Sequence, residues 1–467
     1  MADKERKVVE DVVIEGMSSE GKGFAKVDGK VIFTQFAVPG DVMDIELRKS
    51  RKKFSEAIIA QLKLPSVLRT EPACSHFGVC GGCKWQHIQY AEQLKFKRQI
   101  VEDAFTRIGK VSFPVIPEVL GCKDNYYYRN KLEFAFTDRR WLTQQEITSS
   151  MEFEHRNGLG FHVPESFSGV LDIEHCYLQA DPSNQIRLAV RDFALKHGYT
   201  FFDLYNQTGF LRNLLIRTSS TGELLVLISF FANDEDKIKA LLDFLMEQFP
   251  QITSLQYVIN PKRNDTIYDL ETKVYHGNAY IIEQLGKYKF KIGPKSFFQT
   301  NSVQAKVLYD VTKQFAGLKS SDVVYDLYTG VGSIAIYVSD ACKHITGIEQ
   351  IESAIEDAKE NAKLNSVANT SFYAGDVRMV LKDDFIAANG RPDVVITDPP
   401  RAGMHEDVVK TLLQLECPKI IYVSCNPATQ ARDLQLLDEK YEVKRAQPVD
   451  MFPHTTHIEN VVKLELK

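Results

Sequence analysis

The stretch Val323-Val324-Tyr325-Asp326-Leu327-Tyr328-Thr329-Gly330-Val331-Gly332-Ser333 decides the fold of the C-terminal part of this 467-residue chain. It is typical of a β-branched strand that runs into a glycine turn and then into an apolar helix. Further apolar runs alternate with helical stretches, among them residues 353–364. The predicted strands are residues 323–326, 344–349, 371–375, 394–397 and 420–424. This alternation predicts a doubly wound, mostly parallel sheet of the α/β class, a Rossmann-like domain.

The N-terminal half has a different pattern. Residues 8–63 alternate short β-type runs with glycine turns, which predicts a small barrel. Residues 88–108 have helical spacing, and this helix is a candidate to pack on the C-terminal domain. Aromatic and β-branched runs from 126 to about 292 predict a mainly β central domain, interrupted by one helix near 233–247. Because the chain exceeds one ordinary core, we expect domains at 1–64, 65–292 and 293–467.

The composition, 44 % hydrophobic and 25 % charged, is that of a soluble globular protein. The first residues are too charged for a secretory signal, and no apolar run is long enough to span a bilayer. We therefore expect a cytoplasmic monomer without a membrane partner. The net charge of −5 gives no global signature of nucleic-acid binding, so RNA affinity must come from local patches. One basic run, Arg48-Lys49-Ser50-Arg51-Lys52-Lys53, is either a solvated loop or such a patch.

The glycine turn is the first candidate ligand site. Gly330 and Gly332 allow a tight turn and a close approach of the backbone to a ligand. The turn lacks the spacing of a full dinucleotide fingerprint, which argues against a pyrophosphate. Glu349 ends the next predicted strand, where an acidic side chain can accept both hydroxyls of a ribose. Together they predict a nucleoside cofactor, and the alternative is a purely structural turn.

A second motif, Asp398-Pro399-Pro400-Arg401, follows the predicted strand 394–397. Paired prolines stiffen the loop and hold Asp398 and Arg401 at the sheet edge where such folds bind ligands. Methyltransferases that act on amino groups carry a similar Asp-Pro-Pro, followed by an aromatic residue that stacks on the base. Arg401 stands in that place here, which weighs against methylation of an exocyclic amine.

Cys425 lies in Lys419-Ile420-Ile421-Tyr422-Val423-Ser424-Cys425-Asn426-Pro427, where a buried strand delivers a thiol onto a polar turn. The alternative for such a cysteine is a small core filler. A thiolate that adds to C6 of a pyrimidine makes C5 an enolate carbon, which can attack an electrophilic methyl group. A base must then remove the C5 proton. Glu459 is the predicted base, and His454 and His457 are rivals in the same segment.

Three cysteines, Cys74, Cys80 and Cys83, lie in a glycine-rich segment, and Cys176 follows far downstream. Four thiolates suit an iron–sulfur cluster or a zinc ion. Glycines let backbone amides donate to cluster sulfurs, and the second Cys-x2-Cys pair of a zinc knuckle is missing. The fourth cysteine argues for a closed, structural cluster. The alternative is a mixed zinc site that includes nearby histidines: His76, His87 or His175.

These motifs, in this order, resemble the RNA uracil-5-methyltransferase family. The resemblance covers nearly the whole chain, though it is weaker between about 185 and 290. Its most specific parts are Ser424-Cys425-Asn426-Pro427 and the segment from Asp450 to Glu459. Phe297-Phe298-Gln299-Thr300-Asn301 also matches. Without the resemblance, this run is equally consistent with aromatic side chains that stack on a base and with ordinary core residues.

The resemblance implies Cys425 as the nucleophile and Glu459 as the base of a methyl transfer to uracil C5. The methyl donor is S-adenosylmethionine, and the residues implied to contact it are Gln299, Tyr328, Glu349, Asp376 and Asp398. Asp376 matches a position that is Asn in some relatives. Thr329 stands where many relatives have a cysteine, which changes no proposed chemistry.

The N-terminal barrel resembles the TRAM domain, an OB-like RNA-binding module. The four cysteines match the [4Fe-4S] ligands of the branch that modifies 23S ribosomal RNA, which implies Cys74, Cys80, Cys83 and Cys176 as cluster ligands. The bacterial transfer-RNA branch generally lacks both features. The predicted partner is therefore large-subunit ribosomal RNA, and the alternative is the same chemistry on a transfer RNA.

Three other functional classes compete with this interpretation. A non-catalytic RNA-binding ribosome-assembly factor would not need the intact Cys425 and Glu459. An iron–sulfur redox enzyme would need an open cluster, whereas four cysteines predict a closed one. A DNA cytosine-5 methyltransferase shares the C6 addition, but its nucleophile follows a proline, and Cys425 precedes Asn-Pro.

Overall fold

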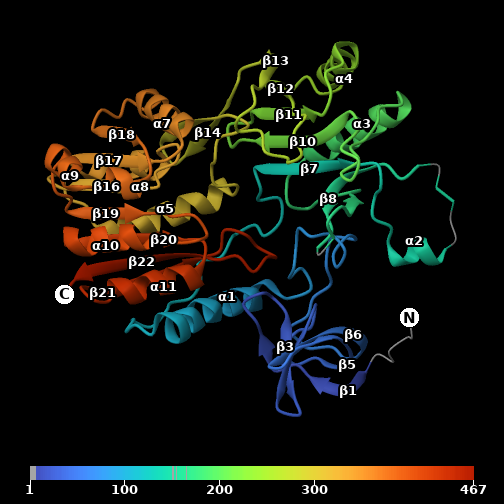
Figure 1. Ribbon diagram of the computed structural model, residues 1–467, viewed down its shortest axis with the longest axis horizontal. Helices are drawn as coiled ribbons and strands as arrows, with labels where there is room; N and C mark the ends of the chain where they lie inside the picture. The colour runs from blue at the N-terminus through green and yellow to red at the C-terminus, as the bar shows by residue number, and fades with distance from the viewer. Residues whose placement is uncertain (1–6, 150–151, 154, 165) are drawn as a thin grey trace.

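The computed structural model describes residues 7–149, 152–153, 155–164 and 166–467. The charged first six residues, on which the expectation about a secretory signal rests in part, lie outside this description. Within it, no helix has the length and apolar character that crossing a membrane requires. Three large sheets and one hairpin organise the chain, as Figure 1 shows.

The N-terminal sheet has six strands in the order β1-β5-β6-β4-β3-β2. They are β1 (Val8–Val13), β2 (Gly16–Met17), β3 (Gly23–Val27), β4 (Lys30–Thr34), β5 (Val42–Ser50) and β6 (Phe54–Leu64). β1 also approaches β3, so the sheet curls on itself. Alternation along the strands places Ala25, Ile32, Met43 and Ile45 in its core. The predicted small barrel is confirmed.

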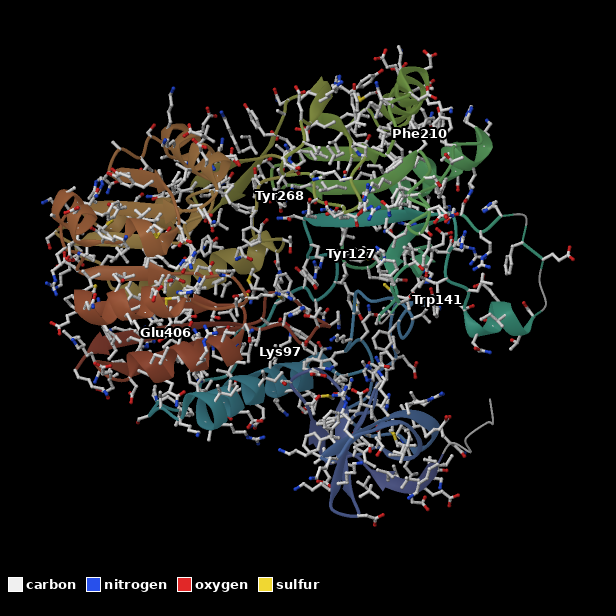
Figure 2. The ribbon with its side chains drawn as sticks, in the orientation of Figure 1. Lys97, Tyr127, Trp141, Phe210, Tyr268 and Glu406 are labelled. Atoms are coloured by element: carbon white, nitrogen blue, oxygen red, sulfur yellow. The ribbon has the colours of Figure 1, made fainter. Side chains whose placement is uncertain are left out.

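A helix after the barrel runs along the C-terminal domain. α1 (Tyr90–Ala104) continues into one wider helical turn, η1 (Phe105–Gly109). Val101 and Phe105 are fully buried in a core that also contains Tyr422 and Leu434. Lys97 lies on the same helix, where it meets the C-terminal segment (Figure 2). The helix predicted over 88–108 thus forms and packs on the C-terminal sheet.

The central sheet has seven strands in the order β13-β12-β11-β10-β7-β8-β9. They are β7 (Lys131–Thr137), β8 (Gly158–His162), β9 (Val170–Asp172), β10 (Leu211–Thr218), β11 (Leu224–Phe230), β12 (Ser254–Ile259) and β13 (Lys273–Gly277). The hairpin of β14 (Ile281–Leu285) and β15 (Tyr288–Ile292) follows. The described part of this region also contains α2 (Gln144–Thr148), α3 (Ser183–Lys196) and α4 (Glu235–Gln248).

The expectation of a single helix in this region is therefore wrong. α4 matches the predicted helix, whereas α2 and α3 were not expected. α3 buries Ile186, Val190 and Ala194, which are spaced by one helical turn. Apolar residues at other positions of the helix, Leu188, Ala189 and Phe193, hide this period in the sequence.

The C-terminal sheet has seven strands in the order β18-β17-β16-β19-β20-β22-β21. They are β16 (Val323–Leu327), β17 (His344–Glu349), β18 (Thr370–Ala374), β19 (Val394–Thr397), β20 (Lys419–Ser424), β21 (Tyr441–Val449) and β22 (Glu459–Leu466). β18, β17, β16, β19 and β20 are mutually parallel, and β22 is antiparallel to both its neighbours. The predicted doubly wound α/β fold is confirmed.

Helices cover both faces of this sheet, and the sheet separates two hydrophobic cores. They are α5 (Ser302–Ala316), α6 (Ser333–Val338), η2 (Ser339–Ala341), α7 (Glu352–Leu364), α8 (Val377–Val380), α9 (Asp383–Asn389), α10 (Glu406–Leu415) and α11 (Pro427–Leu437). The parallel strands end at one common edge, where Tyr328, Glu349, Asp398 and Cys425 follow them. Because β22 is antiparallel, it begins at that same edge with Glu459.

Candidate active site

Cys425 and Glu459 meet where β20 ends and β22 begins. Ser424 pairs with Asn460 across these antiparallel strands, so the neighbouring residues Cys425 and Glu459 reach the same edge. Glu459 is 4 % exposed, and burial together with the charge of Asp398 raises the pKa of its carboxyl to about 8. Burial and the charge of Glu459 raise the pKa of the Cys425 thiol to about 11. Both groups therefore hold a proton at neutral pH unless a cation approaches them.

The loop after β19 brings a carboxyl and a guanidinium to this edge. Burial and the charge of Asp326 raise the pKa of Asp398 to about 7. The Arg401 carbonyl accepts a hydrogen bond from Asn426 Nδ2 (3.0 Å), which ties the loop to the start of α11. The charge of Arg401 opposes the rise in pKa of both the thiol and the base. Arg401 is therefore the cation that this chain itself supplies to the site.

The glycine turn leaves open space for a ligand. Gly330 has a φ of +55°, and a side chain at this position would meet no atom within 4 Å. Its N–H donates to Glu349 Oε2 (3.2 Å), which fixes the carboxylate at the end of β17. Asp326 is buried, and its Oδ1 has no hydrogen-bond partner among the described residues. Burial raises the pKa of Asp326 to about 7.

Three further predicted cofactor residues lie around this edge. Burial and then the charge of Asp376 raise the pKa of the half-buried Tyr328 to about 12, so the carboxylate lies near the turn. Asp376 also accepts from the Arg378 N–H (2.9 Å) at the start of α8 and forms an ion pair with its guanidinium. Gln299 is buried before α5, where its carbonyl accepts from Asn130 Nδ2 (3.1 Å).

The aromatic and amide residues before α5 divide between core and surface. Phe298 is buried with its ring centroid 5.5 Å from that of Phe290, whereas Phe297 is 70 % exposed. Asn301 Oδ1 accepts from the Gln304 N–H (3.1 Å), and Asn301 Nδ2 donates to the Met451 carbonyl (3.0 Å). Phe298 and Asn301 are therefore structural, and Asn301 holds the segment before Glu459 against α5.

The two histidines near the base have different surroundings. The His454 N–H donates to Gln93 Oε1 (2.9 Å), and its ring centroid lies 4.5 Å from that of Tyr126. His457 Nε2 lies 3.5 Å from Arg401 Nη2. Burial lowers the pKa of both imidazoles to about 4. His454 is thus packed between α1 and Tyr126, whereas His457 lies beside Arg401.

Sequence reasoning missed one group in the site, Tyr309. This tyrosine is buried on α5, and its hydroxyl lies 2.8 Å from Ser333 Oγ. Burial raises its pKa, and the charges of Asp398, Asp326 and Glu459 add to the rise, so the phenol lies among all three carboxyls. In the sequence, Tyr309 is one apolar position on a helix, and no local signal distinguishes it from a core residue.

The four predicted cluster cysteines line a single cavity. Cys74, Cys80, Cys83 and Cys176 come together there, although Cys176 is far from the others in the chain. Burial raises the pKa of Cys80 to about 12 and that of Cys83 to about 11. The Gly82 N–H also donates to Cys80 Sγ (3.4 Å). These thiols need a positively charged centre if they are to ionise.

The histidines of the alternative zinc site have other partners. His76 Nε2 accepts from the Glu174 N–H (2.9 Å), and His175 Nε2 lies 3.2 Å from the Tyr127 hydroxyl. His87 does not line the cysteine cavity, because its ring packs against Phe77. Over the residues that the structure describes, no three His, Cys, Asp or Glu side chains are close enough to hold one metal ion.

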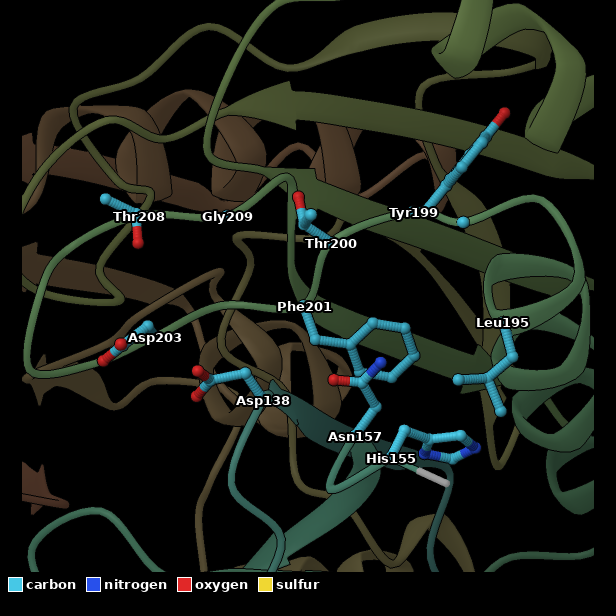
Figure 3. Close-up of a pocket in the computed structure, with 11 residues that line it drawn as sticks. Asp138, His155, Asn157, Leu195, Tyr199, Thr200, Phe201, Asp203, Thr208 and Gly209 are labelled. Carbon is cyan, nitrogen blue, oxygen red and sulfur yellow. The ribbon is translucent and has the colours of Figure 1, made fainter. Parts of the chain in front are cut away.

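A separate hollow lies in the central part of the molecule (Figure 3). Asp138, His155, Tyr199 and Asp203 are among its lining residues, and none of the predicted site residues is. Burial and the charge of Asp203 raise the pKa of Asp138. This hollow is therefore not part of the edge that gathers Cys425 and the carboxyls.

Comparison with known proteins gives consistent matches over the chain. A model of tRNA (uracil-5-)-methyltransferases matches residues 216–467, and a TRAM domain model matches residues 4–60. An uncharacterized RNA methyltransferase of Bacteroides thetaiotaomicron is 52 % identical over 454 residues, which cover 97 % of this chain and 100 % of that protein. Another, of Porphyromonas gingivalis, is 51 % identical over 458 residues, which cover 97 % and 98 %.

Among solved structures, the chain is similar to the Pyrococcus abyssi tRNA (uracil-54, C5)-methyltransferase in complex with S-adenosyl-L-homocysteine. The TM-score is 0.75 at 29 % sequence identity, and the match covers 97 % of this chain and 100 % of that one. The similarity therefore extends over the barrel, the central sheet and the C-terminal sheet together.

Proposed function

Because the chain belongs to the tRNA (uracil-5-)-methyltransferase family and carries a TRAM domain, we propose that it methylates C5 of a uridine in 23S ribosomal RNA. The observation that carries this proposal is the meeting of Cys425 and Glu459 at the ligand edge of a Rossmann-like sheet. In this proposal residues 1–64 bind RNA, residues 65–292 carry the cysteine site, and residues 293–467 are catalytic.

The residues at the glycine turn fit S-adenosylmethionine, which when bound supplies an electrophilic methyl group. Open space over Gly330 admits the ligand, and Glu349 would accept the ribose hydroxyls. The unpartnered Oδ1 of Asp326 and the half-buried Asp398 are acceptors that suit a cationic ligand. Gln299, Tyr328 and Asp376 would complete the binding surface.

The proposed reaction begins at Cys425. Once the thiol has lost its proton to solvent, its Sγ forms a bond to C6 of the uracil, and the electron pair of C5=C6 moves onto C5 and O4. C5 would then take the methyl group of S-adenosylmethionine, and S-adenosylhomocysteine would leave. Glu459 removes the proton from C5, the C5=C6 bond re-forms, and the thiolate leaves. Arg401 favours the thiolate at the start, because its charge lowers the free energy of the ionised sulfur.

The assignment of Glu459 as base is supported by its surroundings. It lies beside Cys425, and a pKa of about 8 makes its deprotonated form, which a cationic ligand would favour, a stronger base than an ordinary carboxylate. His454 is held in packing contacts with Gln93 and Tyr126. His457 has a pKa of about 4, which makes it a weak base.

For the cysteine site we propose a [4Fe-4S] cluster held by Cys74, Cys80, Cys83 and Cys176. All four line one cavity, and the raised pKa values of the thiols call for a cationic centre. A single zinc ion needs all its sulfurs at about 2.3 Å from one centre. A cluster keeps its thiolates farther apart, since irons and sulfides lie between them.

The experiment that tests the proposal is transfer of a tritiated methyl group from S-adenosylmethionine to RNA from a strain that lacks this gene. Ribosomal and transfer RNA are assayed separately, and the label is mapped to a nucleotide. We expect label at C5 of a large-subunit uridine and none with Cys425→Ala. Absence of label in both RNA pools, with the cofactor shown to bind, would contradict the proposal and favour a non-catalytic assembly factor.

A second candidate is the same chemistry on a transfer RNA. One observation favours it: the Pyrococcus abyssi enzyme, which matches 97 % of this chain, acts on uracil 54 of a tRNA. Label in transfer RNA alone in the same experiment would select this candidate. The roles of Cys425 and Glu459 would then stay as proposed.

A further inference from the structure

Three phenylalanines lie side by side on the outside of the N-terminal barrel. Phe24 on β3 pairs directly with Phe33 on β4, and Val31 pairs with Phe54 on β6. These pairings place all three rings on one face of the sheet. The ring centroids of Phe24 and Phe33 are 6.4 Å apart, and those of Phe33 and Phe54 are 5.8 Å apart. We call Phe24, Phe33 and Phe54 the phenylalanine strip.

The strip is not part of the barrel core. Buried residues alternate with the three rings along the strands, and Ala25, Ile32 and Ala57 belong to the core on the opposite face. The rings themselves are partly exposed. The Phe24 ring also packs over Gly16, where an added Cβ would lie 2.6 Å from the ring. No such contact accounts for the outward position of the other two rings.

Cations surround the strip. Lys22, directly before β3, and Lys26, on β3, stand on either side of Phe24, and alternation puts them on its face. The Arg51 guanidinium lies 5.6 Å from the centroid of the Phe54 ring. Lys52 and Lys53 follow and are exposed. Acids also lie here: Lys22 pairs with Glu56 at 3.1 Å and with Glu20 at 3.9 Å.

The strip lies close to the segment of residues 450–459, which leads to Glu459. The turn before β3 contains Gly21, whose carbonyl accepts from Trp85 Nε1 (3.3 Å). An added Cβ on Gly21 would lie 2.5 Å from Thr456 Cγ2, so this turn touches the segment that leads to Glu459. Phe24 is only three residues further along the chain. RNA that leaves the active site on this side therefore meets the strip.

We propose that the phenylalanine strip stacks on unpaired bases of single-stranded RNA that flanks the target uridine. Aromatic rings bordered by cations are the features that proteins use to bind single strands, since every base has a stacking face and every nucleotide a phosphate. The basic residues from Arg51 to Lys53 hold the phosphates in this proposal. It rests on the proposed function for the identity of the RNA, and its test is independent of catalysis.

The test compares leucine with tyrosine at two strip positions in the full-length protein. Phe33→Leu with Phe54→Leu keeps apolar area but removes the stacking face, whereas Phe33→Tyr with Phe54→Tyr keeps that face. Binding of a fluorescein-labelled oligouridine of about twelve nucleotides is measured by anisotropy over a range of salt concentrations. We expect the leucine variant to bind about ten-fold more weakly or worse, and the tyrosine variant to bind like the wild type.

The salt dependence separates stacking from charge. The leucine variant should keep the wild-type slope of log K against log salt. Replacing Arg51, Lys52 and Lys53 by alanine should reduce that slope by about 2, since each phosphate contact on a single strand contributes about 0.7. Leu64→Ala changes an exposed residue at the far end of β6 and should leave binding unchanged. Thermal unfolding followed by circular dichroism shows whether each variant is folded.

Two outcomes would overturn the proposal. One is unchanged affinity of the folded leucine variant for the oligouridine. The other is equal weakening of the tyrosine and leucine variants, which would assign the strip to packing or to a protein partner. Binding is measured without methyl transfer, so the two proposals can fail separately. If the leucine variant bound RNA more weakly but the wild type transferred no methyl group, the strip would be supported and only the proposed function contradicted. If the leucine variant bound RNA normally and the wild type transferred methyl groups, only the role of the strip would be contradicted.

Discussion

At the level of single residues, the site is dominated by buried acid. Asp326 and Glu459 are buried and Asp398 is half-buried, and each has a pKa raised to about 7 or 8. Arg401 is the cation whose charge reaches both Cys425 and Glu459. Such an excess of acceptors is stable only while the carboxyls hold protons or while a cationic ligand is bound. The electrostatics therefore favour a positively charged cofactor.

Glu459→Gln should separate the two halves of the proposed reaction. Glutamine cannot take the C5 proton, so Cys425 stays bound to the methylated base. We expect a covalent protein–RNA adduct that survives denaturing gel electrophoresis, with turnover reduced by at least about 100-fold. Cys425→Ala serves as the control and should give neither adduct nor product. Full turnover by the glutamine variant would assign the base to another residue, His457 first.

The raised carboxyl pKa values also predict how stability changes with pH. Glu459 releases its proton near pH 4.5 when unfolded and near pH 8 when folded, so between these values the folded state binds more protons. Stability contributed by the protonated carboxyl is therefore lost as pH rises towards 8. Asp326 and Asp398 act in the same direction up to about pH 7.

Chemical denaturation between about pH 7 and pH 8 tests this prediction. In this window His454 and His457 are neutral when folded and mostly neutral when unfolded, so they contribute little. The free energy of unfolding should fall with pH, and it should fall less in Glu459→Gln. An equal pH dependence in both proteins would contradict the raised pKa of Glu459.

The residues that sequence alone could identify share one property. Cys425 and Asp398 stand directly after a predicted strand and Glu349 is the last residue of one, and strand ends are visible as the limits of apolar runs. Tyr309 and Lys97 could not be found in this way. Tyr309 meets carboxyls from three separate segments, and the Lys97 partner is Asp450, 353 residues away. Local sequence contains no trace of such contacts.

At the level of elements, regular strand–helix alternation was the strongest guide. The strands 344–349 and 394–397 have the predicted limits, since short β-branched runs there are bounded by polar turns. The barrel was also foreseen from its glycine turns. The antiparallel insertion of β22 between β20 and β21 was not predicted, although it is what brings Glu459 to Cys425. Strand order depends on packing between distant segments, and local pattern does not specify it.

The connection between α1 and the segment before β22 gives a prediction about stability. Lys97 Nζ donates to Asp450 Oδ1 (2.6 Å), and both side chains are fully buried. The Tyr90 hydroxyl donates to Asp450 Oδ2 (2.9 Å). Lys97→Met removes one charge and leaves the other buried without its partner. It should lower the free energy of unfolding by about 3–5 kcal/mol.

A matched control for this change is Lys95→Met. Lys95 lies on the same helix, is 71 % exposed and pairs with Glu92 at 2.7 Å. An exposed pair contributes at most about 1 kcal/mol, so this variant should unfold almost like the wild type. Both are measured by urea denaturation. Equal effects of the two substitutions would show that the buried pair does not hold α1 to the catalytic segment.

At the level of the whole molecule, His454 is the place where distant parts meet. Its carbonyl accepts hydrogen bonds from the N–H groups of Lys84 (2.8 Å) and Trp85 (3.0 Å), which directly follow Cys83. Its own N–H donates to Gln93 on α1. The cysteine site, α1 and the segment leading to Glu459 are thus joined through one buried residue. The proposed cluster would thus be connected to the segment that leads to Glu459 through hydrogen bonds of the protein itself.

Loss of the proposed cluster should therefore loosen the catalytic segment, residues 450–459. Cys83→Ser removes one proposed ligand, and the residues after it would no longer hold Lys84 and Trp85 against His454. Two backbone hydrogen bonds at about 1 kcal/mol each predict roughly 30-fold faster amide exchange at these positions. Hydrogen exchange with mass spectrometry of peptides that cover 84–85 and 450–459 measures this directly. Iron content is determined on the same samples.

Cys342→Ser is the matched control, because Cys342 is also buried but lies outside the cysteine cavity. It should keep both the iron and slow exchange in the catalytic segment. Peptides from β10 and β11 should exchange alike in all three proteins, since these strands lie in the centre of another sheet. If Cys83→Ser lost iron while residues 450–459 stayed protected, the cysteine site would be independent of the catalytic segment. The hydrogen bonds at His454 predict instead that loss of the cysteine site loosens residues 450–459.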